Sequence, residues 1–179
     1  MRFDAAPSLR VWAVRIELGG HTYRIPPRPA SDWLEAIAAP GLGALVPGLL
    51  ERTDDADELL DLVLDGAIQF TEWQNAARSA IAEISGTKWW SATRLTAYLL
   101  GHWGTIGAAV LARTDPTTAP LGAVLTHTYR ILLENCKDEQ ERQRLDMELD
   151  HPPAGIPVAE MFDQRQATAN FMALANAPM

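Results

Sequence analysis

The sequence predicts an α+β domain that is predominantly α-helical, with an N-terminal β-hairpin packed on a helical bundle. Two alternating apolar runs flank a Gly-Gly dipeptide within residues 11–25, which is typical of a hairpin. Later in the chain, apolar residues recur at three- and four-residue steps, the spacing of amphipathic helices. The 179 residues suit one domain. We expect this domain over residues 1–155 and a C-terminal arm over residues 156–179.

The hairpin is expected over residues 11–25. Gly19 and Gly20 separate the two runs, and a two-residue turn of type I′ or II′ requires the positive φ that glycine tolerates. Such a turn pairs Leu18 with His21 and collects the apolar residues on one face. That face consists of Val14, Ile16, Leu18, His21, Tyr23 and Ile25. An isolated hairpin is marginal in water, so the face needs a cover, either from the helices or from another subunit.

The helices are expected within residues 31–149. They are a short helix that carries Trp33, Leu34 and Ile37, a short helix or turn in 42–50, and helices over 56–65, 70–86, 88–112, 121–135 and 138–149. Ser31 or Asp32 is expected to cap the first helix and Asp55 the helix over 56–65, because short polar side chains accept the first free amides. Asp138 is expected to cap the helix over 138–149, with Glu141 three residues later. Gly66 and Gly86 suit the left-handed position that ends a helix. The helix over 88–112 is expected to break near residues 101–104.

Charge and cysteine content exclude several classes of function. The chain has 15 basic and 23 acidic residues and a net charge of −8. Nucleic acid is not an expected partner, because phosphate binding needs a basic surface. The single cysteine excludes an internal disulfide and a cysteine-rich zinc site. Residues 95–112 contain no Asp, Glu, Lys or Arg, but polar residues and glycines interrupt them, which favours a buried helix over a membrane span.

Sequence motifs that mark catalytic or metal-binding sites are mostly absent from the chain. The chain contains no GxSxG, HExxH or Walker A sequence, each of which would mark a specific chemistry. Its four histidines have no partners at diagnostic spacing. We therefore expect neither enzymatic activity nor a cofactor or metal. The acidic run 54–58 lacks the glycine of an EF-hand loop and is interpreted as a negatively charged helix start.

Trp89 and Trp90 begin one of the expected helices. Adjacent side chains point about 100° apart on a helix, so the two rings cannot share a pocket. At least one is expected to face another element or another chain. Core packing and an exposed partner contact both remain open at this stage.

A stripe of small residues follows on the same helix, at Ala97, Gly101, Gly104 and Ala108. Their spacing places them along one helical face. Glycine in a helix interior costs about 1 kcal/mol relative to alanine. The close approach of a second helix is the expected compensation.

The C-terminal arm follows the proline-rich segment 152–157. Its apolar residues are Val158, Met161, Phe162, Phe171, Met172 and Leu174. Methionine suits adaptable binding surfaces. The arm is expected to be helical and weakly docked, either on its own domain or on a partner.

Several segments occur in an order that resembles a known family. They are LGGHTYRIPPRPASDWLEAI from residue 18, KWWSA at residues 88–92 after the helix end at Gly86, Trp103 in an apolar helix before Asp115-Pro116, PLGAVLTHTYRILLE, and RLDMELDHPPAG at residues 144–155. Taken together, this order resembles the tail assembly chaperones of long-tailed, siphovirus-type phages that infect actinobacteria. The resemblance covers roughly residues 14–155.

The resemblance implies a non-enzymatic role in viral morphogenesis. Such chaperones bind the tape measure protein, a long helical chain that sets tail length, and keep it soluble while tail tube subunits assemble. A longer form, made by ribosomal frameshifting, carries an extra domain that recruits the tube protein; this chain would be the short form or the common part. The implied partners are the tape measure protein, the tail tube protein, the longer form and further copies of this chain. The implied location is the host cytoplasm, and the mature virion is expected to lack the protein.

The expected partner-binding residues are Trp89, Trp90, Trp103, Met161, Phe162, Phe171 and Met172. We expect the tryptophans to line an apolar groove for an amphipathic helix, with acidic residues around it that favour basic client segments. One alternative is a structural virion protein, either a head–tail connector or a tail-completion component. An enzyme with an unfamiliar site would instead need His102, His127 and acidic side chains gathered in one cleft.

Overall fold

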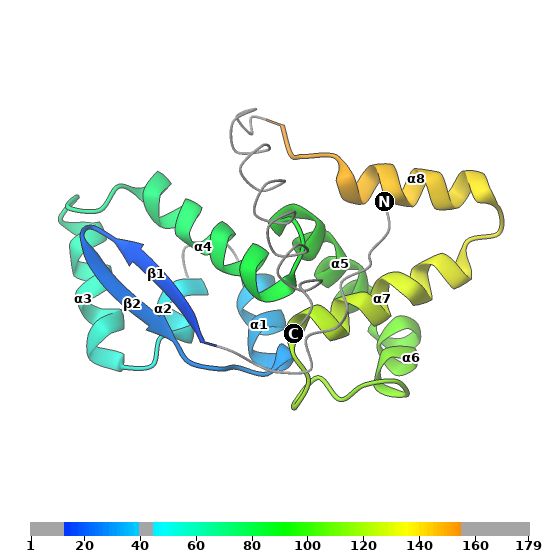
Figure 1. Cartoon of the computed structure of the whole chain (residues 1–179), viewed down its shortest axis with the longest axis horizontal. Helices are drawn as coiled ribbons and strands as arrows, with labels where there is room; N and C mark the ends of the chain where they lie inside the picture. The colour runs from blue at the N-terminus through cyan, green and yellow to red at the C-terminus, as the bar shows by residue number, and fades with distance from the viewer. Residues whose placement is uncertain (1–12, 40–44, 155–179) are drawn as a thin grey trace, which may run out of the picture.

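The computed structural model describes residues 13–39 and 45–154, and Figure 1 shows how their elements are arranged. Two antiparallel strands, β1 (Val14–Leu18) and β2 (His21–Ile25), come first. The helical elements are α1 (Ala30–Ala38), α2 (Leu45–Leu49), α3 (Thr53–Leu64), α4 (Phe70–Ser85), α5 (Trp89–Gly101), the π-helical turn η2 (Trp103–Gly107), α6 (Ala108–Leu111), α7 (Leu121–Asn135) and α8 (Glu139–Asp150). The predicted fold class, a predominantly helical α+β fold with an N-terminal hairpin, is confirmed.

The hairpin has the predicted register. Its paired residues include Val14 with Ile25, Ile16 with Tyr23, and Leu18 with His21. Gly19 and Gly20 have φ angles of 57° and 81°, so the turn is of type I′, one of the two predicted types. The expected apolar face is buried except at His21. The His21 side chain is exposed, and its imidazole Nδ1 lies 3.8 Å from a carboxylate oxygen of Glu58.

The chain's own helices cover the hairpin, which was one of the two alternatives. Figure 1 shows α4 running beside β1. At the turn, the Gly19 N–H donates to the Glu72 carboxylate at 3.2 Å. A Cβ atom at Gly19 would lie only 2.8 Å from the Ile68 side chain, so glycine allows this close contact. On the other strand, the Glu51 N–H donates to the Arg24 carbonyl at 3.3 Å.

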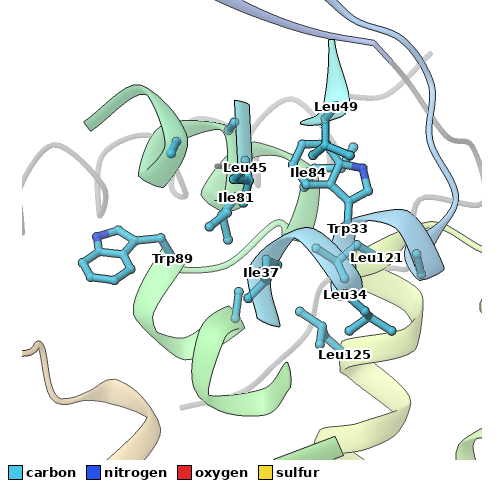
Figure 2. Packing of buried hydrophobic residues seen from close by; sticks show 14 of the residues in the cluster. Trp33, Leu34, Ile37, Leu45, Leu49, Ile81, Ile84, Trp89, Leu121 and Leu125 are labelled. Atoms are coloured by element: carbon cyan, nitrogen blue, oxygen red, sulfur yellow. The ribbon is translucent and has the colours of Figure 1, made fainter. Parts of the chain in front are cut away.

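Helix α1 lies within the helical core. Its Trp33, Leu34 and Ile37 are buried, as their spacing predicted. Figure 2 shows them among side chains from three other helices, namely Leu45 and Leu49 of α2, Ile81 and Ile84 of α4, and Leu121 and Leu125 of α7. Segments far apart in the sequence therefore share one core.

The cap predicted for the first helix is wrong. Helix α1 begins at Ala30, before both Ser31 and Asp32, and neither side chain caps it. The first amides of a helix lack partners within the helix. Here the loop before α7 supplies them, because the Ala30 N–H donates to the Ala119 carbonyl at 2.8 Å and the Ser31 N–H to the Pro116 carbonyl at 2.9 Å.

The cap predicted at Asp55 is also wrong. Helix α3 begins at Thr53, so Asp54 and Asp55 lie in its first turn. Their carboxylates are 3.6 and 3.7 Å from the Arg52 guanidinium. Negative charge in the first turn interacts favourably with the positive, N-terminal end of the helix dipole. This agrees with the interpretation of the acidic run as a helix start.

Three other predicted helix boundaries are confirmed. Gly66 and Gly86 follow α3 and α4 with positive φ angles of 76° and 66°. The carboxylate of Asp138 accepts the Glu141 N–H at 2.8 Å, and the Glu141 carboxylate accepts the Lys137 N–H at 2.8 Å. This reciprocal pairing closely resembles a capping box at the start of α8.

Side chains of α5 hold the C-terminal end of α8. The Ser91 hydroxyl donates to the Leu149 carbonyl at 2.6 Å, and the Trp90 indole N–H donates to the Asp150 carbonyl at 3.3 Å. Lys88 forms an ion pair with the carboxylate of the same aspartate. The last carbonyls of a helix lack partners within the helix, so these bonds fix the point where the chain leaves α8. The arm expected over residues 156–179 lies outside the described residues.

Candidate protein-binding surface

Two of the predicted partner-binding tryptophans are buried. Trp89 is 7% exposed and Trp90 is 2% exposed. Their rings meet edge to face with centroids 5.8 Å apart. The Arg78 guanidinium lies 4.8 Å from the centroid of the Trp89 ring, while Trp90 contacts α8 through its indole N–H. This corrects the expectation that the pair lines an open groove. Because adjacent helical residues point in different directions, each ring is covered by a different element.

Trp103, the third predicted tryptophan, lies at the surface. Helix α5 ends at Gly101, and the chain continues through His102 into the π-helical turn η2, so the break near residues 101–104 is confirmed. Trp103 is 43% exposed. A Cβ atom at Gly107 would lie 2.6 Å from a Trp103 ring atom, so the ring rests directly on the backbone of that glycine. The other predicted residues, Met161, Phe162, Phe171 and Met172, lie outside the described residues.

The stripe of small residues does not contact another helix within the described part of the chain. Ala97, Gly101, Gly104 and Ala108 are all exposed. A Cβ atom at Gly101 or Gly104 would meet nothing within 4 Å. This corrects the expected helix–helix contact. Helices α4, α7 and α8 pack on other sides of α5, which leaves the stripe open beside Trp103.

The exposed residues between 97 and 111 form an uncharged surface, which we call the Trp103 surface. It consists of Ala97, Leu100, Gly101, His102, Trp103, Gly104, Thr105, Ala108 and Leu111. Leu100 and Leu111 are 38% and 51% exposed. The centres of protein–protein interfaces are depleted of charged residues and enriched in aromatic ones. The sequence showed this uncharged run, but we interpreted it as a buried helix. Only its inner face is buried, so the two exposed leucines were missed.

Charged groups next to the Trp103 surface are paired with other groups. Arg113 contacts the Glu134 carboxylate at 2.7 Å, and this hydrogen bond raises the pKa of Arg113 and lowers the pKa of Glu134. The Tyr98 hydroxyl donates to the Glu148 carboxylate at 2.6 Å. Mainly through this hydrogen bond, the pKa of Tyr98 rises to about 12. Arg113 and Tyr98 therefore already have partners within the chain, and these pairs would be in place when a partner protein covers the surface.

The histidines named for an enzymatic alternative lie on different elements. His102 follows α5 on the Trp103 surface, whereas His127 lies on α7. Burial, followed by the charges of Arg130 and Arg113, lowers the pKa of His127. In the part of the chain that the structure describes, no group of three or more histidine, cysteine or acidic side chains is placed to hold a metal ion.

No helix among the described residues has both the length and the apolar character needed to cross a membrane. Comparison with protein families, curated proteins and solved structures finds no match for this chain.

Proposed function

We propose that this protein is a tail assembly chaperone of a long-tailed phage and that it binds the tape measure protein through the Trp103 surface. The observation that carries the proposal is an exposed, uncharged surface with a tryptophan within it. An amphipathic helix binds such a surface by laying its apolar side chains on it. The proposal thus assigns the client binding implied by the family resemblance to the Trp103 surface.

The local geometry of the Trp103 surface suits a helical client. Gly101 and Gly104 have no side chains, and no atom of the described residues covers them, so the backbone of a client helix can approach closely. Leu100 and Leu111 supply apolar contacts near Trp103. Tryptophan is one of the residue types enriched among the dominant contacts of interfaces. Binding of this kind lowers the free concentration of an aggregation-prone chain by mass action.

The net charge of −8 supports the same role. A complex that carries excess negative charge resists self-association. Acidic residues elsewhere on the protein also favour client segments with basic residues beside their apolar face.

The first test compares variants at Trp103 and at the glycine beneath it. We expect co-expression to keep a candidate tape measure protein soluble, the candidate being the product of a very long reading frame beside this gene. Trp103→Ala should weaken binding by about 2 kcal/mol or more, which is about 30-fold. Gly107→Ala should weaken it as well, because the new methyl group displaces the Trp103 ring.

Gly48→Ala is the matched control for Gly107→Ala, because residue 48 lies in α2 outside the Trp103 surface and a Cβ atom there meets no atom within 4 Å. It should leave the affinity within about threefold, since open space accepts a methyl group without strain. Equal affinities for all three variants and the parent chain would contradict the proposed surface.

The same proposal includes the host cytoplasm as the location, with the tail tube protein, a frameshifted longer form and further copies of this chain as additional partners. The alternative is a structural virion protein whose Trp103 surface is covered permanently by a neighbouring subunit. Mass spectrometry of purified particles separates these functions. A chaperone is missing from the particles, whereas a connector or tail-completion protein is found there in fixed stoichiometry.

A further inference from the structure

The outer edge of β1 carries backbone groups that have no backbone partner among residues 13–39 and 45–154. In a two-residue hairpin the residues that flank the turn form a hydrogen-bonded pair, and bonded and non-bonded pairs then alternate along the strands. Leu18 and His21 flank the turn here. The N–H and C=O groups of Arg15 and Glu17 therefore point away from β2. The described residues supply no backbone partner for either residue at this edge.

The outer edge of β2 follows the same alternation, but one of its outward groups has a backbone partner. Arg24 is paired with Arg15 across the hairpin, so its backbone groups also point outward. Its carbonyl accepts the Glu51 N–H at 3.3 Å. The outer edge of β2 is thus partly used by the chain itself, whereas none of the residues that the structure describes pairs with the outer edge of β1.

A groove lies between β1 and α4. Its volume is about 320 Å³, the lower end of the size range of ligand pockets (about 300–1,000 Å³). One face of α4 lines it, with Glu72, Asn75, Ala76, Ser79, Ala80 and Glu83. Two of these residues are small alanines, and Ile16 of β1 also lines the groove.

The groove is acidic. Glu17, Glu72 and Glu83 line it with Arg15 as the only basic residue among its described lining residues. Glu72 already accepts the Gly19 N–H. Burial raises the pKa of Glu83, which means that the site disfavours its charge as long as no cation is present. A basic side chain placed in the groove would offset this cost.

We propose that the outer edge of β1 and the facing side of α4 form a second binding site, which takes an extended peptide segment carrying lysine or arginine as a third strand. Main-chain hydrogen bonds supply the affinity in this mode of recognition, and the side chains beside the edge supply the specificity. A two-stranded sheet gains stability from a further strand. The proposal does not depend on the proposed function, because Figure 1 places the hairpin and α6 at opposite ends of the molecule.

The probe is a labelled eight-residue peptide that alternates valine with lysine, titrated with the full chain by fluorescence anisotropy. Arg15→Pro removes the outward N–H at the open edge of β1. Arg24→Pro is the matched control, because it removes the outward N–H of the paired residue on β2 and the same positive charge. Proline is tolerated at edge positions whose N–H faces away from the ladder. The melting temperature of each variant is measured to verify folding.

We expect the peptide to bind the parent chain, with binding at least tenfold weaker for Arg15→Pro and within twofold of the parent for Arg24→Pro. Equal weakening by both prolines would show attraction to an acidic protein without strand addition and would overturn the proposal. No binding by the parent chain at 1 mM peptide, roughly the limit of weak specific association, would overturn it as well.

Two further measurements keep the proposal testable if Arg15→Pro does not fold. Ala76→Leu places a larger side chain in the groove while leaving the residues of β1 unchanged, and it should also weaken binding at least tenfold. A peptide that alternates valine with glutamate should bind at least tenfold more weakly than the lysine peptide, and parity of the two peptides would contradict the charge preference. Trp103→Ala should leave peptide binding unchanged, which separates this site from the Trp103 surface.

Discussion

Two tryptophans of this protein have opposite environments. Trp90 is buried, and its indole N–H donates to the C-terminal end of α8. Trp103 rests on the backbone of Gly107 with much of its ring open to solvent. The same residue type therefore serves the stability of the fold in one place and is available to a partner in the other.

Substitution by alanine should separate these two roles. We expect Trp90→Ala to lower the free energy of unfolding by about 3–5 kcal/mol, the usual cost of a large core cavity. Trp103→Ala should lower it by less than about 1 kcal/mol, since its ring is only partly buried. Urea denaturation measures both values. A larger loss for Trp103→Ala than for Trp90→Ala would contradict the burial described above.

Glycine has a different function at the contact between α4 and α7. Gly122 lies in the first turn of α7, and a Cβ atom there would lie 2.9 Å from the Ser85 carbonyl oxygen at the end of α4. A backbone atom cannot move aside as a flexible side chain can. The missing side chain therefore sets how closely the two helices approach.

At this contact we predict that Gly122→Ala lowers the free energy of unfolding by about 1–3 kcal/mol, the usual cost of overpacking. Gly48→Ala in α2 is the control, because a Cβ atom there meets nothing within 4 Å. It should raise the free energy of unfolding by about 0.5–1 kcal/mol, since alanine loses less backbone entropy than glycine. Chemical denaturation of both variants checks the difference, and a similar effect of the two substitutions would be inconsistent with this helix contact.

The helix boundaries show which local sequence signals were sufficient to predict where a helix begins or ends. Gly66 and Gly86 were predictable because a left-handed residue after a helix is a local requirement. The start of α8 was predictable because Asp138 and Glu141 pair across one turn. The start of α1 was not, because carbonyls from residues 116 and 119 take the place of a side-chain cap. A cap supplied by a distant loop leaves no trace in the neighbouring sequence.

For the molecule as a whole, the environment of His127 couples folding to pH. Burial, and then the nearby Arg130 and Arg113, lowers the pKa of this imidazole in the folded chain. The unfolded chain takes up a proton at His127 near the ordinary histidine pKa of about 6.5, whereas the lowered pKa of the folded chain shifts this uptake to lower pH. The unfolded state then binds more protons, so the free energy of unfolding falls as the pH falls through this value.

A series of His127 variants should reveal this dependence. We expect the parent chain to lose stability between pH 7.5 and pH 5.5, a window set by the ordinary histidine pKa of about 6.5, and His127→Gln to lose less over the same range. Arg130→Gln should also reduce the loss, because it removes one of the charges that oppose protonation. The measurement is the free energy of unfolding by urea at each pH. Identical pH profiles for the parent chain and His127→Gln would contradict the assignment.

The sequence by itself determined the fold class, the hairpin register and the break after α5. Each depends on local features: apolar periodicity, a Gly-Gly turn, and glycines inside a helical segment. It also identified an uncharged run within residues 95–112, together with its tryptophan.

Only the tertiary structure decided which side of that run is exposed. Trp89 and Trp90 are enclosed because α5 packs against both α4 and α8, while no described helix covers Gly101, Gly104 or Trp103. Burial depends on neighbours far away in the sequence. The position of a tryptophan on its own helix therefore cannot distinguish a core residue from a binding residue.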